Sequence, residues 1–141
     1  MIATEDSITG ERTTFDPVSV GQIELEDSQW QYIHEAMLGA TTEQRGSGYT
    51  SMLGAPYRVA GKTGTAQVFS IAQEEKYDAE NVDERLRDHG LFIAFAPVES
   101  PVIAVAVVVE NGGGGARAAA PVARRLLDAY FAEAGYVTRE H

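Results

Sequence analysis

Apolar residues fill two neighbouring runs in the second half of the chain, at residues 91–96 and 102–109. The link between them, residues 97–101, begins and ends with proline, and short apolar runs with such boundaries are typical of β-strands. We therefore expect the two runs to form a β-hairpin. Since apolar residues occupy both sets of alternate positions, the pattern predicts that both faces of the hairpin are covered.

A helix is predicted over residues 28–38, where apolar residues recur at helical spacing. Asp27 or Ser28 can cap its first turn by accepting hydrogen bonds from free amides, and Gly39 is a natural stop. One face of this helix is expected to be buried through Trp30, Ile33, Met37 and Leu38.

A second helix is expected to begin near Pro121, a residue that suits the first helical turn, and to end at Gly135. Its buried face is predicted to comprise Val122, Leu126, Leu127, Tyr130 and Phe131. The glycine-rich segment before it, residues 111–115, is expected to be a flexible turn, because it does not show the glycine spacing of a phosphate-binding loop.

A third strand is predicted over residues 57–68, after Pro56 breaks the chain. Alternation along this strand places Thr63, Thr65 and Gln67 on one side and Lys62, Gly64 and Ala66 on the other. The charged stretch that follows, residues 69–88, is expected to be a crossover with a short helix over residues 79–87. Residues 1–22 are polar and predict a loose segment or short strands.

Composition narrows the classes of function. The 141-residue chain has a net charge of −10, which argues against a nucleic-acid partner because such proteins need a basic surface. We expect no membrane span in this sequence, since no apolar run is long enough for one. We also expect no metal and no cofactor, because the chain has no cysteine and its three histidines are far apart.

Residues 60–67 read Ala-Gly-Lys-Thr-Gly-Thr-Ala-Gln and lie in the predicted third strand. The Lys-Thr-Gly triplet that begins at Lys62 is one of three motifs of the active-site serine enzymes that bind penicillin. The other two, Ser-x-x-Lys and Ser-x-Asn, do not occur in this sequence. Gly-Lys-Thr also ends a P-loop, but that motif needs glycine where Pro56 stands. A surface strand that merely carries a lysine is the alternative without function.

Residues 55–69 resemble the third-strand segment of class B penicillin-binding proteins. The resemblance is narrowed further by residues 85–89, by residues 92–97 and by Val-Glu-Asn-Gly-Gly at residues 109–113. These segments resemble the penicillin-binding protein 2 group, the elongation-specific transpeptidases of Gram-negative bacteria. The resemblance covers residues 25–131. It implies an α+β (α/β sandwich) fragment of the penicillin-binding transpeptidase fold, with an antiparallel sheet of at least three strands and helices packed on it.

The resemblance also implies a division of the chain and roles for residues of the third strand. A polar lead-in at residues 1–24 would precede the C-terminal part of the transpeptidase domain at residues 25–135, and residues 136–141 would form a tail. The implied catalytic residues are Lys62, which supplies positive charge and helps to move a proton, and Thr65, whose N–H is an oxyanion-hole donor. The implied substrate-binding residues are Thr63, Gly64, Thr65 and Gln67.

The activity implied is that of a peptidoglycan D,D-transpeptidase, which forms an acyl-serine from a D-Ala-D-Ala stem peptide and is inhibited by β-lactams. Its role would be cell elongation and cell shape, its partners the elongation machinery, and its location the periplasmic face of the inner membrane, with an anchor outside this sequence. Since the serine motif is absent, we expect this chain alone to be inactive. Two alternatives are a non-catalytic protein-interaction module and a fragment of a serine β-lactamase, which the long charged crossover disfavours.

Overall fold

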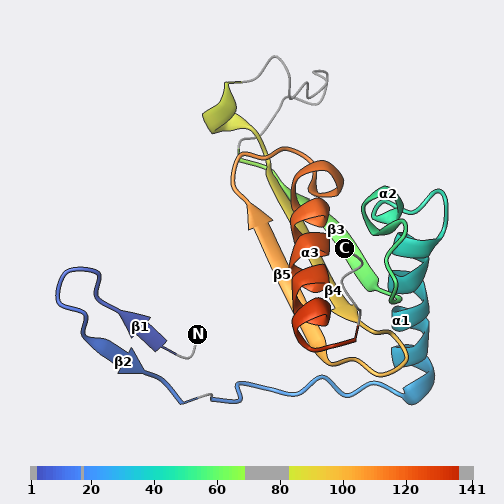
Figure 1. Ribbon diagram of the computed structural model, residues 1–141, viewed down its shortest axis with the longest axis horizontal. Helices are drawn as coiled ribbons and strands as arrows, with labels where there is room; N and C mark the ends of the chain where they lie inside the picture. The colour runs from blue at the N-terminus through green and yellow to red at the C-terminus, as the bar shows by residue number, and fades with distance from the viewer. Residues whose placement is uncertain (1–2, 17, 69–82, 137–141) are drawn as a thin grey trace.

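The computed structural model describes residues 3–16, 18–68 and 83–136, and its centre is an antiparallel sheet in the order β3-β4-β5 with helices packed against it (Figure 1). In chain order the elements are β1 (Ala3–Glu5), β2 (Arg12–Thr14), α1 (Asp27–Thr42), α2 (Tyr49–Met52), β3 (Ala60–Ala66), the 3-10 turn η1 (Glu84–Leu86), β4 (His89–Ala96), β5 (Ile103–Val109) and α3 (Gly115–Glu133). The predicted α+β fold, with an antiparallel sheet and packed helices, is confirmed.

The two apolar runs form the predicted hairpin, β4 and β5, and only one of its faces is covered. Phe92 and Ala94 of β4 are buried beneath α3, whereas Ile93 and Val108 on the other face are 52% and 60% exposed. The prediction that both faces are covered is therefore wrong for the described part of the chain. The reason is that α3 is the only helix in that part that packs along both strands of the hairpin.

The helix α3 begins at Gly115, well before the predicted start at Pro121, which lies inside it. Its buried residues are Gly115, Ala119, Ala120, Ala123, Leu127 and Phe131. In the predicted buried face, Val122, Leu126 and Tyr130 are instead 40%, 50% and 38% exposed. Packing of the small residues against the sheet outweighs the cost of about 3 kcal/mol that an internal proline brings to a helix. The predicted end near Gly135 is confirmed, since this glycine has a φ of 73° just after the helix.

The helix α1 extends beyond the predicted range of residues 28–38 at both ends. Glu26, rather than Asp27 or Ser28, precedes its first turn, and the backbone N–H of Glu26 donates to Oε1 of Gln29 at 2.9 Å. This hydrogen bond gives a partner to a backbone amide that would otherwise lack one at the start of the helix.

At its other end α1 continues past Gly39, because a tertiary contact overrides the weak helical preference of glycine. Thr41 is buried, and its hydroxyl lies within hydrogen-bond distance of the carbonyl oxygen of Val59 just before β3. The first half of the helix contacts the sheet through His34, whose ring lies edge-on to that of Phe95 with the centroids 5.0 Å apart, while Trp30 and Ile33 are 40% and 38% exposed. The predicted buried stripe is therefore wrong at these two positions, while Met37 and Leu38 are half-buried.

The remaining segments differ in how far the structure describes them. At the N-terminus β1 and β2 form a short antiparallel hairpin that stands apart from the main sheet, as Figure 1 shows. Short strands were one of the two outcomes expected for residues 1–22. The helix predicted over residues 79–87 falls partly outside the described residues, and its described part contains only η1.

The glycine-rich turn between β5 and α3 is joined by hydrogen bonds to the segment that leads into β4, while its expected flexibility stays a prediction. Asn111 has a φ of 54°, and its backbone N–H donates to Nδ1 of His89 at 2.9 Å. Its side-chain amide donates to the carbonyl oxygens of Arg85 and Arg87 at 2.9 and 3.0 Å. Asparagine tolerates this left-handed backbone better than most residues, so one residue both turns the chain and holds the segment before β4.

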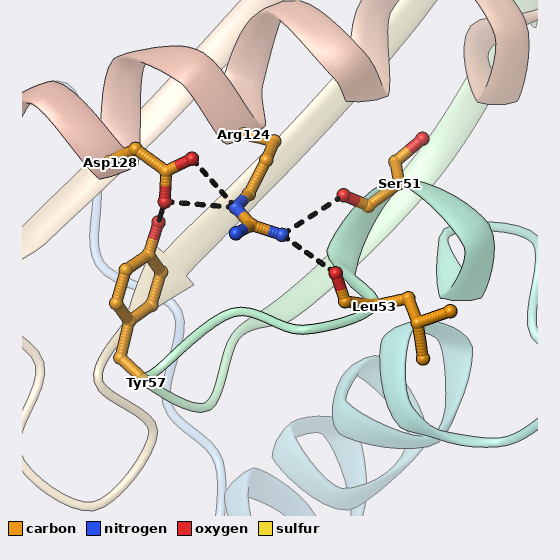
Figure 2. Close-up of polar contacts among 5 residues, drawn as sticks. All are labelled: Ser51, Leu53, Tyr57, Arg124 and Asp128. Carbon is orange, nitrogen blue, oxygen red and sulfur yellow. Dashed lines mark hydrogen bonds and ion pairs between the residues drawn. The ribbon is translucent and has the colours of Figure 1, made fainter. Parts of the chain in front are cut away.

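A polar cluster joins α3 to the segment that leads into β3, as Figure 2 shows. Nε of Arg124 lies 2.9 Å from both carboxylate oxygens of Asp128, and its Nη1 donates to the carbonyl oxygens of Leu53 and Ser51 at 3.0 and 3.5 Å. The hydroxyl of Tyr57 donates to Asp128 at 2.6 Å. The cluster thereby fixes the path of the chain between α2 and β3.

The first prediction concerns the close approach of α3. A Cβ atom at Gly115 would overlap the carbonyl oxygen of Leu91 and lie 2.5 Å from that of Gly64. Gly115→Ser should therefore lower the free energy of unfolding by about 1–3 kcal/mol in urea denaturation. The matched control is Gly114→Ser, because no atom lies within 4 Å of a Cβ at that position and serine suits a helix N-cap. Equal stability of the two variants would contradict the prediction.

The second prediction concerns the polar cluster. Burial, followed by the hydrogen bond to Asp128, raises the pKa of Tyr57 above its ordinary value. A pKa that is raised on folding contributes stability below the unfolded pKa of about 10, and this contribution is lost as the pH rises above that value. The unfolding free energy of the wild type should therefore fall more steeply above pH ~10 than that of Tyr57→Phe.

At pH ~7 Tyr57→Phe should be less stable than the wild type by about 1.5–3 kcal/mol, because it loses one hydrogen bond to a charged group. Tyr32→Phe is the control, since Tyr32 is 75% exposed, and it should leave the stability at that pH unchanged. Urea denaturation over a pH series measures both effects, and parallel curves for wild type and Tyr57→Phe would argue against a role for this hydroxyl.

Candidate active-site strand

The strand β3 lies at the edge of the sheet, since within the described residues it pairs with β4 alone. Nζ of Lys62 donates to the carbonyl oxygen of Thr63 at 2.8 Å, which places that carbonyl on the outer edge. Peptide groups of an antiparallel strand point to its two edges in alternate residues, so the N–H and C=O of Thr65 also point outward. The edge therefore presents a row of peptide groups to which an extended ligand can bind.

The register with β4 decides which side chains of β3 share a face. Thr63 lies opposite Phe92 and Thr65 opposite Gly90, both on the face that α3 covers. Lys62 starts from the opposite face, and its hydrogen bond to the Thr63 carbonyl brings the ammonium back to the outer edge. The ammonium and the backbone of both threonines therefore meet at one edge of the sheet.

The strand is shorter than predicted. The alternation of Lys62 and Gly64 with the threonines is confirmed, but β3 ends at Ala66, where its pairing with β4 ends. Gln67 and Val68 follow the strand and are exposed, so the prediction that the strand extends through them is wrong. It also begins at Ala60 rather than at residue 57. Tyr57 belongs instead to the polar cluster, through its hydrogen bond to Asp128.

The predicted site residues differ in how far they are exposed to solvent. Lys62, Thr65 and Gln67 are exposed, while Thr63 and Gly64 are half-buried. The ammonium of Lys62 takes part in neither of the ion pairs found among the described residues, which join Arg58 to Glu99 and Arg124 to Asp128. An ammonium that joins no carboxylate among the described residues, at the edge of a strand that also carries two threonines, is an arrangement that suits a carboxylate ligand.

Ser47 is a further residue of this site, and sequence reasoning gave it no role. It lies in the turn between α1 and α2, and its Oγ is 2.8 Å from Oγ1 of Thr63. Only its position between Gly46 and Gly48 offered a signal, because small residues allow a turn to approach another segment closely. That signal does not indicate which segment is approached.

The ring of Phe92 forms the floor beneath β3. A Cβ atom at Gly61 would lie 2.7 Å from Cζ of this ring, and one at Gly48 would lie 3.3 Å from its Cε2. Phe92 is 1% exposed, so both glycines rest on a side chain that has no freedom to move away. The strand and the turn that carries Ser47 are thus packed on the same ring.

In the described part of the chain, no group of three or more His, Cys, Asp or Glu side chains lies close enough together to hold a metal ion. Among the same residues, no helix has the length and apolar character needed to cross a membrane. The groups that the site offers are hydroxyls, peptide groups and one ammonium. Groups of this kind are able to bind a carboxylate and an extended backbone.

The Lys-Thr-Gly motif on this strand is one of the motifs of enzymes that recognise penicillin. Residues 2–128 match the penicillin-binding protein transpeptidase domain, and the chain belongs to this family. The peptidoglycan D,D-transpeptidase MrdA of Salmonella typhimurium is 42% identical over 102 residues, which are 72% of this chain and 16% of that protein. The chain thus spans a small part of the length of this relative.

Solved structures agree with that assignment. Penicillin-binding protein 2 of Pseudomonas aeruginosa, in complex with WCK 5153, is 36% identical with a TM-score of 0.65, over 83% of this chain and 23% of that one. Penicillin-binding protein 2 of Helicobacter pylori, in complex with MreC, is 27% identical with a TM-score of 0.64, over 78% of this chain and 18% of that one. The predicted similarity to the penicillin-binding protein 2 group is confirmed.

Proposed function

We propose that this chain supplies the Lys-Thr-Gly strand of a peptidoglycan D,D-transpeptidase. The observation that carries the proposal is the outer edge of β3, where Lys62 places an ammonium beside the outward peptide groups of Thr63 and Thr65. The similarity to MrdA and to penicillin-binding protein 2 supports this reaction class. The substrate would be a stem peptide ending in D-alanyl-D-alanine, whose extended backbone and terminal carboxylate suit such an edge.

In this reaction a serine Oγ attacks the carbonyl carbon of the penultimate D-alanine and gives up its proton. The terminal D-alanine leaves as the free amine, and the acyl group then passes to an amine of a neighbouring peptidoglycan strand. The Thr65 N–H would donate to the oxygen that becomes negatively charged, and Lys62 would stabilise the substrate carboxylate and help to move the proton. The hydroxyls of Thr63 and Thr65 would bind that carboxylate, with Gln67 contributing beyond the end of the strand.

The serine would come from a part of the same protein outside this chain, because neither Ser-x-x-Lys nor Ser-x-Asn occurs in the sequence. The isolated chain would therefore be inactive. β-Lactams would acylate the same serine in the complete protein. By analogy with the complex of the Helicobacter pylori relative, an MreC-like elongation protein would be a partner, and the reaction would take place at the periplasmic face of the inner membrane.

The third prediction tests the role of Lys62 in the full-length natural protein. Lys62→Ala should slow acylation by a penicillin about 100-fold, because it removes the charge that attracts the carboxylate and stabilises the developing transition state. Intact-mass spectrometry over time measures the covalent adduct. Arg58→Ala is the control: it removes an exposed cation just before β3, and its ion pair with Glu99 lies outside the proposed site. A wild-type protein that is folded but never acylated would overturn the proposed function.

The fourth prediction tests whether a ligand lies against the strand. A Cβ atom at Gly64 would lie 3.3 Å from Cβ of Leu91, so the strand needs only a small adjustment to accept a side chain there. Gly64→Val should therefore fold, yet slow acylation about tenfold or more, because a displacement of the bound ligand misaligns the reacting groups. Circular dichroism monitors the fold, and unchanged acylation by the folded variant would indicate that no ligand docks at Gly64.

A further inference from the structure

We propose that Ser47 is a positioning residue, which orients the hydroxyl of Thr63 toward the carboxylate of the substrate. The inference rests on the proposed function, and it adds to the Lys-Thr-Gly strand a residue from a different part of the fold. Its starting point is the distance of 2.8 Å between Oγ of Ser47 and Oγ1 of Thr63. Among the predicted site residues of the strand, Thr63 is the one whose side chain has this contact.

The backbone of the turn fixes where the Ser47 hydroxyl lies. Gly46 N–H donates to Glu43 O at 2.7 Å, and Gly48 N–H donates to Ala40 O at 2.8 Å. A Cβ atom at Gly46 would overlap the Ala40 carbonyl oxygen, so the turn is folded tightly onto the last turn of α1. Residues on both sides of Ser47 are therefore held against α1, which sets the position from which its hydroxyl contacts Thr63.

A second, buried contact sets the position of this turn relative to the strand. The hydroxyl of Thr41, which is 3% exposed, contacts the carbonyl oxygen of Val59 immediately before β3. The end of α1 and the start of β3 are thereby joined in the interior, whereas the Ser47 contact lies at the surface. This buried link helps to align the turn that carries Ser47 with β3.

The chemistry of the hydroxyl pair explains why the contact matters. A hydroxyl group has one proton to donate and two lone pairs with which to accept. When a carboxylate binds, Thr63 must donate its only proton to it, and Ser47 can then donate to a lone pair of Thr63. Such a chain of hydrogen bonds, from Ser47 through Thr63 to the carboxylate, polarises each donor and fixes the direction of the middle hydroxyl.

The test is a double-mutant cycle on the acylation rate constant of the full-length natural protein with benzylpenicillin. Ser47→Ala should lower the second-order rate constant about threefold to tenfold, the range expected for one hydrogen bond. In a Thr63→Val background, which lacks the middle hydroxyl, Ser47→Ala should have no further effect. Ser47→Thr keeps a hydroxyl and should retain the wild-type rate.

Ser51→Ala is the matched control, because Ser51 is a nearby serine whose hydroxyl faces Ala116 in α3 at 3.4 Å and does not reach β3. It should acylate at the wild-type rate, and thermal unfolding of all variants verifies the fold. An unchanged rate in Ser47→Ala, or an equal loss in both backgrounds, would overturn the role of Ser47 while leaving the proposed function in place. Absence of any adduct on the folded wild-type protein would overturn the proposed function and this inference together.

Discussion

The close approach of α3 to the sheet is the constraint on which the rest of this structure depends. The first half of the helix meets the hairpin through residues with small side chains or none, and Ala119 and Ala123 are 0% exposed. On the facing strand, a Cβ atom at Gly90 would lie 3.2 Å from Cβ of Ala118. Because helix and sheet pack at backbone distance, larger residues at these positions would push the layers apart.

This packing also reaches the candidate site. The first turn of α3 lies against the backbone of Gly64 in β3, and α1 reaches the start of β3 through the contact of Thr41 with Val59. β3 is thus held at its middle by one helix and at its start by another, while its outer edge stays open in the described chain. A strand held in this way loses little conformational freedom when a ligand pairs with it, which favours binding through peptide groups.

Features set by local sequence could be predicted, and features set by contacts between distant segments could not. The hairpin and the alternation within β3 follow from apolar runs and strand geometry. The early start of α3 was missed because alanines carry little periodic signal, although Ala119 and Ala120 are fully buried. The extension of α1 depends on Thr41 meeting Val59, and the place of Ser47 depends on the folded turn; neither partner can be identified from the residues around it.

One face of the β4–β5 hairpin is apolar but exposed, although its sequence is typical of a strand that is covered on both faces. Ile93 and Val108 are apolar and more than half exposed, and Met37 and Phe95 border a shallow apolar hollow beside Ile93. A soluble domain seldom exposes a continuous apolar surface of this kind without a partner. In the proposed transpeptidase, a part of the protein outside this chain would cover it. The isolated chain would then lack activity for two separate reasons. It has no serine nucleophile motif, and the apolar face of its hairpin would be exposed to water.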